Sequence, residues 1–196
     1  MVATLIFIYL ATVCATCKKN CIRTDYSFTI NTKAYPALDS IFINDTVWIE
    51  LNEPTILQDA LSGTSIDYSG AQNLGTAIAF DELLGNAQTG NAAMDFDLKL
   101  LQGTQVSNPN TTLIREFLFV EANGRYLFKL GIVPKRVGIF RIGLSNAANV
   151  YTTNNQCSRG GFTINFKETD QHLYFNQWNY GVTPSLPNGG YCFKVK

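Results

Sequence analysis

The sequence has little of what most enzymes and nucleic-acid-binding proteins use. It contains a single histidine, His172, among 196 residues, which leaves little material for a hydrolytic triad or a zinc site built on several histidines. The 15 basic and 15 acidic residues balance to zero, which argues against binding nucleic acid by neutralising phosphates. No phosphate-cradling loop, no Gly-Xaa-Ser-Xaa-Gly elbow and no run of roughly 20 apolar residues occurs, so neither a cofactor nor a spanning helix is expected.

Alternating apolar and polar residues are the dominant pattern after Cys21. Because 46% of the residues are hydrophobic and 12% aromatic, the chain is expected to fold around a core. About nine segments alternate with the period of two that is typical of half-buried strands, and Asn123-Gly124 predicts a tight hairpin. Helical patterns are confined to 54–62 and 170–178, and 84–93 reads as a long loop. The sequence therefore predicts an all-β protein, an antiparallel two-sheet β-sandwich of immunoglobulin-like type with one or two short helical turns.

The N-terminal segment has the character of a targeting sequence. Residues 1–16 contain no charged side chain, are mostly apolar and end in small residues, and the character changes at Cys17-Lys18-Lys19-Asn20. We expect a signal peptide at 1–16, a tether at 17–23 and a single β-sandwich domain at 24–196. A buried N-terminal strand or helix is the alternative.

Four stretches resemble uncharacterised exported lipoproteins of the Bacteroidetes type. They are Cys17-Lys18-Lys19-Asn20, the segment from Asp39 to Trp48, the segment from Cys157 to Tyr174, and the terminal Tyr191-Cys192-Phe193-Lys194-Val195. The resemblance implies that Cys17 is acylated and anchors the chain in the outer membrane of the cell envelope, facing either the periplasm or the surface. It also implies O-glycosylation at Ser40 and Thr46, because each lies between an aspartate and an apolar residue. It implies no activity.

Three cysteines remain in a chain that begins at Cys17 and uses that residue for lipid. Because an exported chain meets an oxidising environment, we expect a disulfide between Cys157 and Cys192, on the assumption that their strands are adjacent. This pairing leaves Cys21 free. The alternative is a bridge from Cys21 to either of them.

Asp95 and Asp97 are the acidic residues best placed for chemistry. Both lie on one face of a predicted strand, about 7 Å apart, where two carboxylates can bind Ca²⁺ or act on a glycan. Alternation alone also explains them as a solvated face shared with Lys99. His172 is expected at the surface or in a hydrogen bond. We therefore predict neither a catalytic residue nor a metal site.

Three aromatic side chains are candidates for stacking on a ligand: Trp48, Trp178 and Tyr180. Trp48 lies opposite the apolar face of its strand, and the other two close the last helical segment. The interpretation that we favour is that both sheet faces are partly buried and that Trp48 belongs to the core. Charge is also uneven along the chain, since 33–99 holds ten acidic residues between its flanking lysines and the span between Glu121 and Glu168 holds seven basic ones. We expect these halves to pair through salt bridges, the alternative being an acidic rim that attracts cations or sugars.

These observations favour a non-catalytic cell-envelope lipoprotein that binds or adheres at a surface, with a glycan or a protein as ligand and no nucleic acid. The alternative is a carboxylate-dependent enzyme acting on glycans, or a calcium-binding module, using Asp95 and Asp97.

Overall fold

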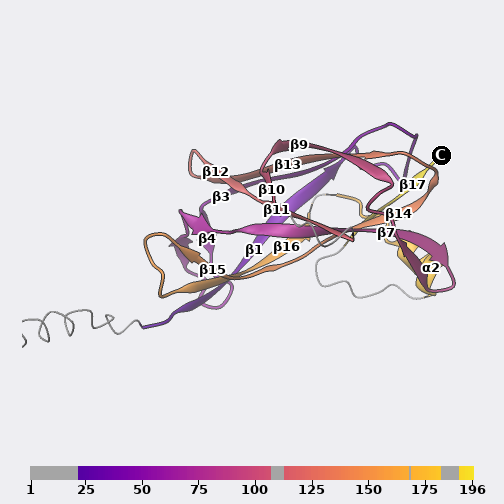
Figure 1. Ribbon diagram of the computed structural model, residues 1–196. Helices are drawn as coiled ribbons and strands as arrows, with labels where there is room; N and C mark the ends of the chain where they lie inside the picture. Colours follow the sequence, from indigo (N-terminus) through magenta and orange to yellow (C-terminus); the bar gives the residue numbers. More distant parts are fainter. Residues whose placement is uncertain (1–21, 107–112, 168, 182–189) are drawn as a thin grey trace, which may run out of the picture.

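Residues of alternating burial pair into two large sheets that face each other. The computed structural model describes residues 22–106, 113–167, 169–181 and 190–196. Figure 1 shows β9, β13 and β3 in one layer above β7 and β14 in the other. The predicted all-β two-sheet sandwich is confirmed.

Sheet 1 has eight strands, and its order β12-β13-β3-β1-β16-β15-β6 is extended by β9, which pairs with β13. Their bounds are β1 (Asp25–Tyr35), β3 (Val47–Pro54), β6 (Ala71–Gln72), β9 (Phe96–Gln102), β12 (Val120–Ala122), β13 (Arg125–Pro134), β15 (Ala147–Thr152) and β16 (Arg159–Phe166).

Sheet 2 has seven strands in the order β10-β11-β7-β14-β17-β2, with β8 paired to β7. Their bounds are β2 (Ser40–Ile41), β7 (Gly75–Gly85), β8 (Gln88–Asn91), β10 (Thr104–Gln105), β11 (Ile114–Leu118), β14 (Gly138–Leu144) and β17 (Tyr191–Val195). A small hairpin joins β4 (Ile56–Gln58) to β5 (Ser65–Asp67), and one helix, α2 (Tyr174–Tyr180), is described.

Each large sheet contains one parallel pair, so the sheets are mixed and not wholly antiparallel. β1 runs parallel to β16, with Phe28 opposite Phe162, and β17 runs parallel to β2. Parallel neighbours need long crossover connections, and the pairing of residues more than 130 positions apart carries no local sequence signal. The prediction from the sequence therefore did not include the parallel pairs.

Rings from both sheets fill the space between them. Phe96 of sheet 1 lies 5.3 Å from Phe80, 5.0 Å from Phe140 and 6.2 Å from Phe193 of sheet 2, measured between ring centroids. Such contacts add to the hydrophobic stabilisation from burying the rings. Because alternate residues of each strand point into this core, the residues between them lie on the outer faces of the two sheets.

Local predictions had mixed outcomes. The Asn123-Gly124 hairpin is confirmed, since both residues have positive φ and join β12 to β13. The helical turn at 54–62 is wrong, because Ile56–Gln58 pairs with β5 and the Asp59 carboxylate accepts the N–H of Ser62 to close a turn. The loop at 84–93 is wrong too, because Asn86 and Ala87 form a positive-φ turn between β7 and β8.

The predicted Cys157–Cys192 disulfide is wrong. Cys157 is disulfide-bonded, but Cys192 is a free, buried thiol, so the partner of Cys157 lies outside the described residues. The physical reason is topological: β16 follows Cys157 in sheet 1, whereas Cys192 lies on β17 in sheet 2, between β14 and β2. Burial raises the pKa of the Cys192 thiol to about 12, which keeps it protonated and unreactive. The segment predicted as signal peptide (1–16), Cys17 and Cys21 also lie outside the described residues.

Candidate functional site

The outer faces of the two sheets are covered differently. The helix α2 packs against β7 and β17 of sheet 2, where its Asn179 side chain accepts the N–H of Gly85 at 2.6 Å. Among the described elements, none of the helices or strands is drawn across the outer face of β9, β13, β3 and β1 (Figure 1). We call this surface the open face.

Strand register sets the side chains of the open face in rows. One row places Lys33, Glu50 and Lys129 side by side on β1, β3 and β13. The next places Tyr35 and Trp48 beside Gly131 and Lys99, the last on β9. These residues alternate with the buried positions of their strands, so strand geometry alone directs their side chains outward.

Trp48 is half-buried because its ring lies over the backbone of Gly131. A Cβ atom at residue 131 would meet Cζ3 of Trp48 at 2.8 Å and its Cη2 at 3.0 Å, so glycine leaves the room that the ring occupies. The Lys129 ammonium lies 5.5 Å from the centre of the Trp48 ring and 5.4 Å from that of Tyr35. Trp48 is therefore half-buried on the outer face, and the favoured interpretation that it belongs to the core is wrong.

Glu50 is the centre of the charge arrangement. Its carboxylate accepts the Tyr35 hydroxyl at 2.6 Å and lies 3.3 Å from the Lys33 ammonium and 3.1 Å from that of Lys129. The hydroxyl hydrogen bond, helped by the two lysines, holds the pKa of Glu50 below its ordinary value. Glu50 is thus a permanent anion that two cations share.

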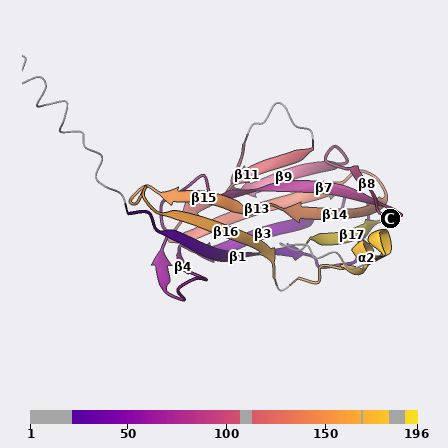
Figure 2. The same cartoon turned by 90° about the horizontal axis from the view of Figure 1, so that it is seen from below.

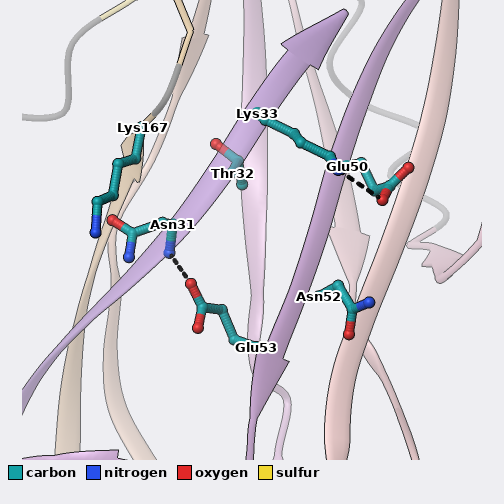
Figure 3. A pocket seen from close by; sticks show the side chains of 7 residues that line it. All are labelled: Asn31, Thr32, Lys33, Glu50, Asn52, Glu53 and Lys167. Carbon is teal, nitrogen blue, oxygen red and sulfur yellow. Dashed lines mark hydrogen bonds and ion pairs between the residues drawn. The ribbon is translucent and has the colours of Figure 1, made fainter.

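A polar hollow of about 300 Å³ adjoins this row. Figure 3 shows its lining on β1, β3 and the segment after β16, with the Glu53 carboxylate accepting the backbone N–H of Asn31 at 3.0 Å. The Lys167 side chain extends beside Asn31, while that of Lys33 turns toward Glu50. The lining residues are Asn31, Thr32, Lys33, Glu50, Asn52, Glu53 and Lys167.

The other two stacking candidates lie elsewhere. Trp178 is exposed on α2, with its ring over Gly85 at the β7–β8 turn. Tyr180 is half-buried, and its ring centre lies 6.0 Å from the Arg141 guanidinium. The structure therefore separates Trp178 and Tyr180 from Trp48, and the three do not form one platform.

Asp95 and Asp97 do not converge on a common point. Asp95 accepts Arg136 at 2.7 Å, and the same guanidinium also binds Glu82, whereas the exposed Asp97 pairs with Lys135 at 3.4 Å. No group of three or more potential metal ligands among histidine, cysteine, aspartate and glutamate occurs in the described part of the chain. These contacts match the expected pairing of the acidic half with the basic half.

His172 is buried and packs against the Tyr191 ring at a centroid distance of 5.7 Å. Its Nδ1 lies 3.4 Å from the Asp170 carboxylate, and its Nε2 has no hydrogen-bond partner within the described parts of the chain. His172, which was expected at the surface or in a hydrogen bond, is thus buried in the core just before the start of α2.

Ser40 and Thr46 lie at strand ends, as O-glycosylation requires, but both are half-buried. The Ser40 hydroxyl donates to Asp39 at 3.1 Å, and the Thr46 methyl lies beside Gly131 and Trp48 on the open face. Their modification stays a prediction.

Sequence reasoning missed most of the open face. Lys33, Glu50 and Lys129 each look like an ordinary solvated position, and only the register of three strands sets them in one row. Lys167 joins them through the long-range pairing of β1 with β16. The available signal was the excess of basic residues between 121 and 168, since Lys129 and Lys167 come from it.

No family model matches the sequence, and no curated protein is similar to it. Among solved structures, one that resembles it is a non-cellulosomal cohesin from the hyperthermophilic archaeon Archaeoglobus fulgidus. The match has 10% sequence identity and a TM-score of 0.25, and it covers 80% of this chain and 95% of that one. At that TM-score the likeness carries no argument about function.

Proposed function

We propose that this chain is a non-catalytic binding module of the cell envelope, anchored through a lipid on Cys17, that binds a glycan on the open face. The observation that carries the proposal is the polar hollow of about 300 Å³, whose Lys33 and Glu50 lie one row from Tyr35 and Trp48, on a sheet face with no described element over it.

The mixture of groups suits a sugar. Sugars present apolar C–H faces, which pack on aromatic rings, and hydroxyl groups, which need both donors and acceptors. The open face has two half-buried rings, lysine donors and the carboxylates of Glu50 and Glu53. No hydrogen bond to another described residue uses the side-chain amide of Asn31, which leaves a donor and an acceptor for a ligand.

The direction of the chain is compatible with anchoring at its beginning. The described chain starts at the end of the sandwich opposite α2 and the C-terminus (Figure 2). A lipid-bearing tether at that end leaves the open face, which runs along the length of the sandwich, accessible to a ligand. None of the described helices is long and apolar enough to cross a membrane.

A matched pair of tryptophan variants tests the binding proposal. We expect the full-length protein to bind members of a glycan array, and Trp48→Ala to lower the affinity about tenfold or more, as loss of a central aromatic contact does. Trp178→Ala removes an equally large but more exposed ring from α2, which packs on the other sheet, and should leave binding unchanged. Both variants are checked for an unchanged melting temperature. Equal effects of the two variants, or no glycan bound at all, would refute the proposal.

Anchoring has its own test. Cys17→Ala should move the protein from the membrane to the soluble fraction of the native host, because acylation supplies the membrane affinity. A variant that stays with the membrane and keeps residues 1–16 would contradict it.

The enzyme alternative finds less support. A retaining or inverting glycosidase needs two carboxylates facing one bond, whereas Asp95 and Asp97 are each paired with a different basic residue. Turnover of polysaccharides that Asp95→Asn abolishes would revive that alternative.

A further inference from the structure

We infer that the open face recognises an acidic glycan, whose carboxylate or sulfate groups bind Lys167, Lys33 and Lys129 while a sugar ring packs on Trp48. This inference rests on the proposed function and specifies its ligand class.

The first argument is the charge of this face. The rows beside Trp48 and the hollow together hold four lysines and two glutamates, in a protein of zero net charge. These residues are Lys33, Lys99, Lys129 and Lys167 against Glu50 and Glu53. The local excess of positive charge favours an anionic ligand and speeds its approach.

The second argument is the position of Lys167 next to Lys33. Thr32 pairs with Phe166 in the parallel register, and the Lys167 N–H donates to the Thr32 carbonyl at 2.8 Å. The next residues on the two strands are both lysines. Their side chains turn apart, that of Lys33 toward Glu50 and that of Lys167 along Asn31, so an anion in the hollow would meet the Lys167 ammonium.

The third argument is that only one of these two lysines has a partner. The Lys33 ammonium pairs with Glu50, whereas among the described residues no salt bridge reaches Lys167 or Lys99. Figure 3 shows the Lys167 ammonium at the hollow beside the Asn31 amide. A carboxylate or sulfate in the hollow would find both a cation and an amide donor there.

The shape of the face favours a glycan over an anionic membrane. Surfaces that insert into a membrane project several apolar side chains, whereas Trp48 lies down on Gly131, Leu127 is half-buried in its row, and the exposed Leu101 lies on the edge strand β9. A concave polar hollow beside a flat ring suits a chain of sugars.

Paired ligands and paired variants test the inference. The probes are polygalacturonate beside its fully methyl-esterified form, and heparin beside desulfated heparin, so that each pair differs in charge and not in backbone. We expect the wild-type protein to bind at least one acidic form about tenfold or more tighter than its neutral partner. We also expect this binding to weaken as salt is added.

Glu50→Gln gives the sharpest result. Removing this carboxylate releases Lys33 and Lys129, so the affinity for the acidic glycan should rise about threefold or more, whereas a merely structural role for Glu50 would lower it. Lys167→Gln should lower the affinity about three- to tenfold. Lys194→Gln, the same change at an exposed lysine of sheet 2, should leave it unchanged.

The failures are distinguishable. Tighter binding of the neutral forms, or weaker binding by Glu50→Gln, overturns the acidic-glycan inference and leaves the binding module intact. Binding to vesicles of anionic phospholipid, with no glycan bound, overturns both proposals in favour of a membrane surface. An effect of Lys194→Gln equal to that of Lys167→Gln would show attraction by total charge alone and would also overturn the inference.

Discussion

The two sheets pair their carboxylates with different basic residues, and the two arrangements serve different ends. Under α2 on sheet 2, the Arg141 guanidinium binds Asp81 at 2.5 Å and lies against the Tyr180 ring, so one cation meets one anion in a half-buried pair. On the open face of sheet 1, Glu50 is shared by two lysines, and Lys167 lies at the hollow without a salt bridge to any described residue. Arginine suits a fixed planar pair, and lysine suits a solvated, movable charge. The closed pairs stabilise the fold, and the open lysines remain available to a ligand.

The cysteines of the two sheets also differ. Cys157, just before β16 of sheet 1, is disulfide-bonded, whereas Cys192 in sheet 2 is a buried thiol. Extending the register of β1 and β16 backwards from Asp25 and Arg159 places Cys157 opposite Arg23, two residues from Cys21. We therefore expect a Cys21–Cys157 bond. Cys157→Ala should lower the free energy of unfolding by about 3–5 kcal/mol, because the bond closes a long loop. Non-reducing peptide mapping together with denaturant unfolding measures both.

Cys192 supplies the control for this measurement, since it should resist alkylation until the protein unfolds. A peptide linking Cys157 to Cys17 would contradict both this pairing and the proposed lipid anchor.

Removing one carboxylate from each sheet should separate the two kinds of ion pair. Asp81→Asn leaves the half-buried Arg141 without its anion and should lower the free energy of unfolding by about 1–3 kcal/mol. Glu50→Gln should change it by less than about 1 kcal/mol, because its lysines are more exposed and can turn to water. Urea titration of both variants measures the difference, and a larger loss for Glu50→Gln would reverse the assignment of roles.

Two glycine substitutions, one in each sheet, test whether ligand binding depends on the position of the Trp48 ring. Gly131→Ala forces the Trp48 ring away from the sheet and should weaken glycan binding about tenfold. Gly143→Ala on β14 of sheet 2 meets only the Ala79 methyl, at 4.0 Å, and should leave binding unchanged. Isothermal titration of the two variants gives the answer. Unchanged binding by Gly131→Ala would show that the ring position is irrelevant to the ligand.

A feature could be predicted from the sequence when the residues that form it are close together along the chain. The alternation around Trp48 and the Asn123-Gly124 turn are local signals, and both predicted the structure well. The Cys157–Cys192 pairing failed because sheet membership depends on strand order, which no local pattern records. The hollow was invisible for the same reason, since Lys167 reaches it only through the parallel pairing of β1 with β16. The helical turn predicted at 54–62 was wrong because Asp59 was assigned to a helix, whereas its carboxylate accepts the Ser27 N–H at 2.8 Å.

That same carboxylate gives the smallest predicted effect. Hydrogen bonds from the Ser27 N–H and the Ser62 hydroxyl lower the pKa of Asp59 from its ordinary value of 3.8. Its contribution to stability is therefore complete above pH 3.8 and is lost as the pH falls through the lower, folded-state pKa. Asp59→Asn should flatten the acid limb of a stability-against-pH curve while leaving unaltered the glycan binding at the hollow, whose Asn31 lies four residues along β1 from Ser27. An acid limb as steep as that of the wild type would contradict this role.

The most direct test of the difference between the two faces is an amide chemical-shift map of the full-length protein titrated with the acidic glycan that it binds best. The account predicts that the largest shifts fall on Asn31, Lys33, Trp48, Glu50 and Lys129 and on the neighbouring Lys167, with β7, β14 and α2 unchanged. Shifts concentrated on α2 or on β14, with β1 and β3 silent, would contradict the assignment of binding to the open face.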